Sequence, residues 1–280
     1  MESKKQKTSS IEKIVEAANN MNEHLDILER CKQLDFEGRV DLSIGLLSES
    51  IQNSPSSDLY FERGCRYEDI GQFGLAEDDY SYSIRINPKS KYFIARGLLS
   101  SNKNSDHESG LRDFQNALAI EPGDANTYVS ISLTYLSLGK LQRALENARI
   151  GVELAPQVSD SHSCLGQCLL AANQLSEAAN ELHTATVLAP AAANSWSILS
   201  RVYRKLKRFN EAKVALERAI DFDPSISNQI SYGSLLFELD EYSKAIHVFE
   251  EASKGNLTEV QKVLIDGYLG LTKKAIHDVQ

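Results

Sequence analysis

Four side chains in the middle of the sequence are of the types that bind metal ions. His162, Cys164 and Cys168 lie in the stretch "HSCLGQC", and His183 falls on the following predicted helix. Two cysteines at i and i+4 of a helix face the same way, so a zinc site is geometrically conceivable. Cysteine is also common as a small buried residue, and these positions lie near the packing face of the helix. We expect the packing role and predict no metal and no cofactor.

A second group of side chains could bind anions. Residues 201–208 read "RVYRKLKR", with five basic side chains and no acidic one. Arg201 and Arg204 are three residues apart, so they share a face of a helix. The planar guanidinium group suits the oxygens of a carboxylate or a phosphate. The alternative is that these are solvated charges balancing an acidic protein, as we expect for Lys207 and Arg208 at the next turn.

No catalytic constellation accompanies these groups. The sequence has no phosphate-binding glycine loop, no nucleophile elbow and no His-Glu-x-x-His motif, so we predict no enzymatic activity. The net charge of −9 and the pI of about 5.3 argue against nucleic acid as a partner. With no apolar run of membrane-spanning length, no secretory signal and four sparse cysteines, we expect a cytoplasmic protein without membrane insertion.

The prolines reveal the elements that would position these side chains. Five of them are spaced by 34 residues, and a sixth, Pro55, lies 33 residues before the first of the five. The five are Pro88, Pro122, Pro156, Pro190 and Pro224. Each ends an apolar, helix-like stretch such as "NALAIEP", because proline lacks an amide hydrogen and its ring clashes with the preceding turn. The chain is therefore an internal repeat.

Other positions of the unit follow the same period when each proline is counted as position 32. Positions 20 and 27 hold small residues in most units, and position 24 holds bulky ones. Between the two halves of a unit stands a residue that tolerates a left-handed backbone, namely Gly38, Gly71, Gly139 or Asn173. Each unit is thus a helix–turn–helix pair.

With this spacing, the sequence resembles the tetratricopeptide-repeat family over about residues 24–257. The resemblance implies an all-α, right-handed superhelical solenoid of about six to seven antiparallel helix pairs with capping helices at the ends, in which stacking buries a continuous core. Two units depart from the pattern. In the second, Gly97 comes one place early and Gly110 takes the small position, so the turn has gained a residue. The last unit has lost one residue.

The ends of the chain are expected to differ from the repeats. We predict a disordered tail over residues 1–8, N-terminal helices with a divergent repeat over 9–56, tandem repeats over 57–257 and a C-terminal capping helix over 258–280. Ser9-x-x-Glu12 and Thr258-x-x-Gln261 are capping-box patterns that would begin the terminal helices.

In this family, partners bind the concave groove lined by the first helix of each pair, at positions 2, 5, 9, 12 and 13. These positions are acidic in the first full repeat, neutral and partly apolar in the third and fourth, and basic in the fifth. We predict that an acidic segment binds at the basic end and that leucines make apolar contacts further along. The predicted partner-binding residues are Leu133, Leu136, Gln167, Leu170, Asn194, Arg201, Arg204 and Lys205.

The resemblance thus implies a non-enzymatic adaptor or scaffold that binds a protein or peptide. Chaperone-binding members carry lysine at position 5, and the glycosyltransferase-linked repeats carry an asparagine ladder at position 6. The chain has neither pattern. A self-assembling scaffold that forms a homo-oligomer and an assembly or secretion chaperone stay open as alternatives.

Overall fold

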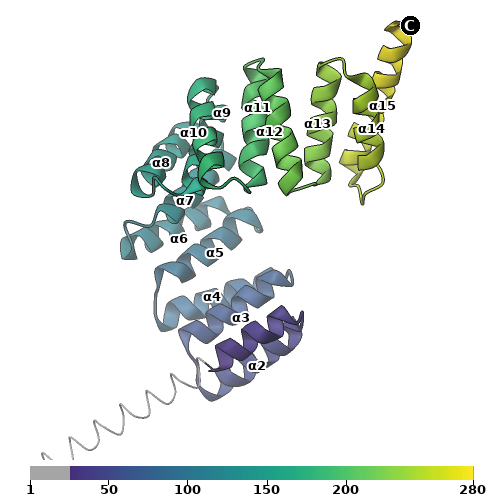
Figure 1. Ribbon diagram of the computed structural model, residues 1–280. Coiled ribbons are helices and arrows are strands. Elements are labelled where there is room, and N and C mark those ends of the chain that lie inside the picture. Colours follow the sequence, from purple (N-terminus) through teal and green to yellow (C-terminus); the bar gives the residue numbers. More distant parts are fainter. Residues whose placement is uncertain (1–25, 280) are drawn as a thin grey trace, which may run out of the picture. The chain divides into compact units, whose positions relative to one another are not determined.

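The protein is all-α over the residues that the computed structural model describes, 26–279 (Figure 1). Residues 26–36 are helical and precede α2. The remaining helices are α2 (Val40–Asn53), α3 (Ser57–Asp69), α4 (Phe73–Ile86), α5 (Ser90–Asn102), α6 (His107–Ile120), α7 (Ala125–Ser137), α8 (Leu141–Leu154), α9 (Ser159–Ala171), α10 (Leu175–Leu188), α11 (Ala193–Lys205), α12 (Phe209–Phe222), α13 (Ile226–Glu238), α14 (Tyr242–Ala252) and α15 (Glu259–Val279). The predicted tail over residues 1–8 and the Ser9-x-x-Glu12 capping box lie outside the described residues.

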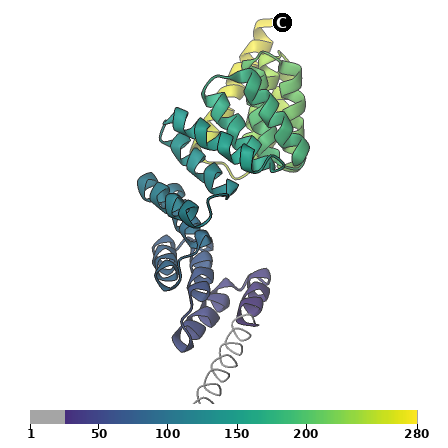
Figure 2. The same ribbon diagram turned by 90° about the vertical axis from the view of Figure 1, so that its left-hand side faces the viewer.

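The helices pack as sequential pairs, which confirms the all-α solenoid. The described residues divide between Gly123 and Asp124 into two compact units, called unit 1 and unit 2. In unit 1, α3 pairs with α4 and α5 pairs with α6. In unit 2, the pairs are α7–α8, α9–α10, α11–α12 and α13–α14, and α15 covers the last pair (Figures 1 and 2). No helix in the described range is both long enough and apolar enough to cross a bilayer.

The turns follow the predicted signals. Every helix that precedes one of the six repeat prolines ends two residues before it, as α8 does at Leu154 before Pro156. All four positions expected to be left-handed are so, with φ between 58° and 76° at Gly38, Gly71, Gly139 and Asn173. Ser105, Lys207 and Asp240 also have positive φ. In the second full repeat, four residues, 103–106, separate α5 from α6, where the next repeat uses three, 138–140. The inserted turn residue predicted there is therefore present.

The core is built where a bulky side chain of one helix lies over a glycine of its partner. At position 24, Tyr80 and Leu182 are at most 1% exposed. A Cβ atom on Gly64 would come within 2.7 Å of the Tyr80 ring, and one on Gly166 within 2.5 Å of the Leu182 side chain. Position 8 therefore needs a very small residue so that the paired helices can approach closely.

Unit 1 adds buried ion pairs to this apolar packing. The Arg63 guanidinium donates two hydrogen bonds of 2.8 Å to Asp79 and a third, of 3.1 Å, to the Ser48 hydroxyl of the preceding helix. Arg96 and Asp113 repeat this arrangement one unit later, at 2.7 and 2.8 Å. These arginines stand at position 7, where unit 2 has aliphatic residues in its first three pairs. The same helix contact is thus made by charge in one unit and by apolar packing in the other.

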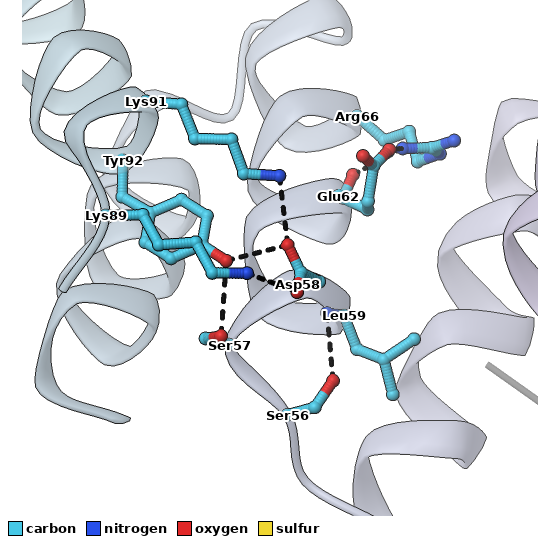
Figure 3. Close-up of polar contacts among 9 residues, drawn as sticks. All are labelled: Ser56, Ser57, Asp58, Leu59, Glu62, Arg66, Lys89, Lys91 and Tyr92. Carbon is cyan, nitrogen blue, oxygen red and sulfur yellow. Dashed lines mark hydrogen bonds and ion pairs between the residues drawn. The ribbon is translucent and has the colours of Figure 1, made fainter. Parts of the chain in front are cut away.

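A second polar network joins α3 to α5 (Figure 3). The Asp58 carboxylate accepts hydrogen bonds from Lys89 at 2.7 Å, from Lys91 at 2.9 Å and from the Tyr92 hydroxyl at 2.7 Å. Partial burial opposes ionisation, but these hydrogen bonds outweigh it and hold the pKa of Asp58 well below its usual range. At the start of α3, the Ser56 hydroxyl caps the helix by accepting from the backbone N–H of Leu59.

The C-terminal helix begins at the predicted capping box. The backbone N–H of Thr258 donates to the Gln261 side chain at 2.9 Å, and the N–H of Gln261 donates back to the Thr258 hydroxyl at 3.3 Å. Ile265 of α15 is buried in a cluster with Leu236 and Phe249. The opposite side of α15 exposes Val260 and Val263, each 69% accessible to solvent.

Candidate functional site

All eight residues predicted to bind a partner lie in unit 2, on α7, α9 and α11, the first helices of three successive pairs. Residues at the same position of successive repeats lie on neighbouring first helices. Two open cavities lie along these helices: the polar cavity, which combines polar and apolar side chains, and the basic cavity.

The polar cavity, of about 200 Å³, brings together three of the predicted residues, Leu133, Gln167 and Asn194. Its remaining lining is Val129, Asp160, Ser163 and Cys164. The four α9 residues among these recur at i, i+3, i+4 and i+7, so one face of that helix forms the wall. Side-chain amides both donate and accept hydrogen bonds, as does a peptide group. The cavity therefore offers what an extended peptide backbone requires.

The basic cavity, of about 340 Å³, is lined by Arg201, Arg204, Lys205 and Glu238. Arg204 forms an ion pair with Glu238 and donates a hydrogen bond of 3.3 Å to the Ser234 hydroxyl. Arg201 and Lys205 are exposed and form no ion pair with any residue between 26 and 279. The guanidinium and the ammonium group available to an anion are therefore those of Arg201 and Lys205, while Arg204 is already neutralised by a carboxylate from the next repeat.

The three leucines predicted to make apolar contacts differ in exposure. Leu133 is 38% exposed and lines the polar cavity. Leu136 is half-buried at the edge of the core, and Leu170 is only 7% exposed and belongs to the core of unit 2. Leu170 consequently offers little surface to a partner, because α9 is enclosed by neighbouring pairs on both sides.

The histidine and the two cysteines of "HSCLGQC" contact different partners. His162 contacts Glu181 through Nδ1 at 2.7 Å and the Pro156 carbonyl through Nε2 at 3.0 Å, while both cysteine sulfurs approach the Ser132 hydroxyl. The hydrogen bond to Cys168, together with burial, raises the pKa of the Cys164 thiol, which therefore stays protonated and weakly nucleophilic. Within residues 26–277, no three potential ligands cluster as a metal site would require.

Comparison with known proteins identifies the repeats. Tetratricopeptide-repeat family models match residues 129–185 and 193–226, which include α9 and α11. Together with the periodicity and the paired helices, these matches show that the chain is a tetratricopeptide-repeat protein, a class of protein-interaction scaffolds.

The curated relatives match only in part. Serine/threonine-protein phosphatase T of Trypanosoma brucei brucei is 36% identical over 94 residues, which cover 34% of this chain and 20% of the relative. The lipoprotein NlpI homolog of Haemophilus influenzae is 27% identical over 130 residues, covering 44% of this chain and 40% of the relative. The chain thus spans between a fifth and two-fifths of these relatives.

Two solved structures resemble almost the whole chain. One is a chain of the APC/C hetero-tetramer Cut9–Hcn1, with a TM-score of 0.68 at 14% identity, covering 87% of this chain and 55% of the other. The second is a tetratricopeptide-repeat protein from Parabacteroides merdae, also with a TM-score of 0.68 at 14% identity, covering 89% and 98% of the two chains. At this identity they establish the fold alone.

Proposed function

We propose that the chain is a non-enzymatic adaptor that binds an extended segment of a protein partner across α7, α9 and α11, with an acidic residue of that segment at Arg201 and Lys205. The observation that carries the proposal is the succession of a polar and a basic cavity on one series of first helices. Asn194 in the first cavity and Arg201 in the second are seven residues apart on α11, about 10 Å along the helix axis. An extended segment of three to four residues covers that distance.

The electrostatic contribution comes from Arg201 and Lys205, which form no ion pair within residues 26–279. Exposed Arg201 and Lys205 gain an anionic partner without losing an existing ion pair, whereas Arg204 would have to give up Glu238. Because such rim charges are screened by salt, binding of an acidic segment should weaken as ionic strength rises.

The test is affinity capture from a lysate of the source organism with three forms of the chain. The groove variant is Arg201→Glu/Lys205→Glu, which leaves the Arg204–Glu238 pair intact. The control variant is Arg149→Glu/Arg218→Glu, which changes net charge equally on exposed positions of α8 and α12. Far-ultraviolet circular dichroism verifies that all three are folded.

We expect to find proteins that wild type and the control variant capture equally and that the groove variant captures in at least tenfold smaller amount. These proteins should share an acidic segment, and their binding should weaken at higher salt. Partners retained equally by all three forms would show that the binding surface lies elsewhere.

A second candidate function, self-association, is favoured by the outer face of α15. Val260, Val263, Leu264 and Leu271 are each at least 45% exposed, and nothing lies within 4 Å of the Cβ position of Gly267. An antiparallel copy centred on Gly267 would place Glu259 of each helix near Lys274 of the other, so the charges are complementary. Contiguous exposed apolar faces of this kind mark interaction surfaces.

Sedimentation at two concentrations tests the self-association. We expect the average mass to rise with concentration for wild type and to stay that of a monomer for Val263→Glu/Leu264→Glu. Lys262→Glu, on the flank of the same helix turn, is the control and should behave like wild type. A wild-type mass that stays that of a monomer at both concentrations would exclude the dimer.

A further inference from the structure

A pocket of about 310 Å³ lies between α10, α11 and α12 and shares no residue with the two groove cavities. The rings of Trp196 and Tyr203 line it from one helix, two turns apart. Leu199, Val214 and Ala215 supply aliphatic surface, and the lining is completed by His183, Asn210 and Glu211. A pocket of this size lined mostly by aromatic and aliphatic groups is typical of a binding site.

The two aromatic walls are held in place. The Trp196 Nε1–H donates to the Pro190 carbonyl at 2.8 Å, which orients the indole. The Arg208 guanidinium lies 4.6 Å from the centroid of the Tyr203 ring and is paired with Glu211. The acidic group at the rim is therefore already neutralised, and the pocket presents no unpaired charge to a ligand.

The first full repeat shows which shape fits between such walls. Four 34-residue periods earlier in the sequence, Trp196, Leu199, Tyr203 and Ala215 correspond to Tyr60, Arg63, Tyr67 and Asp79. There, the flat guanidinium of Arg63 lies 5.5 Å from one ring centroid and 5.6 Å from the other while it pairs with Asp79. A planar group thus fits between the residues at positions 4 and 11.

In the fifth repeat no guanidinium lies between the two rings, and Leu199 and Ala215, each 1% exposed, form the floor of the pocket. Leu199 is shorter than Arg63, and Ala215 is the smallest residue at position 23 of the full repeats, where the others have Asp79, Asp113, Asn147 and Glu181. Because the carboxylate is missing as well, a cation would find no counterion on the pocket floor. The complementary ligand is therefore planar and uncharged.

We propose that this pocket receives an aromatic side chain of a protein partner, inserted flat between Trp196 and Tyr203. Exposed Val214, 55% accessible, borders the pocket, and Val187, 63% accessible, stands one turn beyond His183 on α10. The apolar surface thus continues past the space that a single ring fills, which suits a side chain carried on a polypeptide. Buried aromatic anchors with an apolar surround are the usual centres of protein interfaces.

The test uses the fact that Trp196 is the only tryptophan of the chain, so its indole N–H gives a single resonance in a ¹⁵N-correlated spectrum. The probe is N-acetyl-phenylalaninamide, compared with N-acetyl-leucinamide, N-acetyl-argininamide and toluene. We expect a saturable shift with the phenylalanine derivative at a dissociation constant on the order of 1 mM. The leucine and arginine derivatives should bind at least fivefold more weakly.

Two variants close the pocket without touching its aromatic walls. Ala215→Leu fills it with an aliphatic group, and Leu199→Arg/Ala215→Asp rebuilds the ion pair of the first full repeat. Both should weaken probe binding at least tenfold while circular dichroism shows a folded chain. Ala171→Leu, at an exposed position of α9, is the control and should bind like wild type.

Several outcomes would overturn the proposal. These are no saturable shift, equal binding of the leucine derivative, or unchanged binding in both filled variants. Tighter binding of toluene than of the phenylalanine derivative would indicate a site for free aromatic molecules instead of a partner's side chain. Because Arg201→Glu/Lys205→Glu leaves this pocket unaltered, the result is independent of the proposed function of the groove.

Discussion

The ion pair between Arg63 and Asp79 makes a quantitative prediction, because the chain itself contains an apolar version of the same contact. We consider Asp79→Ala, Arg63→Leu and the double variant. The double variant converts this position of the first full repeat to the Leu199 and Ala215 of the fifth. The pair is well buried, with side-chain exposures of 18% for Arg63 and 4% for Asp79.

Asp79→Ala should cost about 3 kcal/mol in the free energy of unfolding, because it leaves a buried guanidinium without its counterion. Contacts with Tyr60, Tyr67 and the Ser48 hydroxyl keep the cost at the lower end of the range. Arg63→Leu should cost about 3–5 kcal/mol, because it leaves the Asp79 carboxylate without a counterion and this carboxylate is the more deeply buried member of the pair. The double variant should lie within about 1 kcal/mol of wild type, because it removes both charges together.

Urea unfolding followed by circular dichroism measures these differences, and hydrogen exchange of α3 and α4 localises them to unit 1. The coupling energy of the double-mutant cycle, the sum of the two single-variant costs minus the cost of the double variant, should therefore be about 5 kcal/mol or more. If the double variant lost as much stability as the two single variants combined, the ion pair would not be interchangeable with the apolar contact. The reasoning from one repeat to another would then be wrong.

Three further substitutions test local features of the structure. Gly110→Ala should destabilise the protein by about 2 kcal/mol, because the new Cβ atom would lie 1.9 Å from the Ser101 hydroxyl oxygen. The control is Gly123→Ala, whose Cβ atom would have no neighbour within 4 Å and which should unfold at the wild-type urea midpoint. Asp58→Asn should cost about 1 kcal/mol at neutral pH, a value lowered by solvent screening of a partly exposed carboxylate. Because the pKa of Asp58 is depressed in the folded chain, its contribution to stability is complete above the ordinary aspartate pKa and is lost as the pH falls below it. The difference in urea midpoint between wild type and Asp58→Asn should therefore shrink from pH 6 to pH 2. An unchanged difference would contradict this role. Lys207→Gly should stabilise the protein by about 0.5–1 kcal/mol and raise the urea midpoint, because Lys207 has a φ of 59°, which glycine adopts without strain. A lower urea midpoint would show that the substitution relieves no strain.

Much of the fold was predictable from the sequence, since the proline period determines which residues must pack. Position 24 is fully buried at Leu47, Phe114 and Leu216, as expected for the bulky residue between paired helices. The capping box at Thr258 and the left-handed turn at Asn173 form as their residue types indicate. These features are local or strictly periodic, so spacing alone identifies them.

The candidate site was harder to predict, because it depends on contacts between repeats. Arg204 was expected to be available to a ligand, but Glu238, 34 residues later, lies on the next first helix and binds it. The helix position of Leu170 predicts that it faces the groove, yet neighbouring helix pairs bury it. The pocket beside Trp196 was also missed, although comparing position 23 across the repeats would have shown that Ala215 leaves space there.

The central claim, that the groove of α7, α9 and α11 binds a protein partner, is tested most directly by site-specific photo-crosslinking. A photoreactive amino acid would replace Gln167, within the polar cavity, or Arg149, on the exposed side of α8. After irradiation in lysate and mass spectrometry, we expect position 167 to give a defined crosslink to an acidic segment of one partner. That crosslink should disappear in the Arg201→Glu/Lys205→Glu background, and position 149 should give none. A crosslink from position 149 but not from 167 would contradict the account.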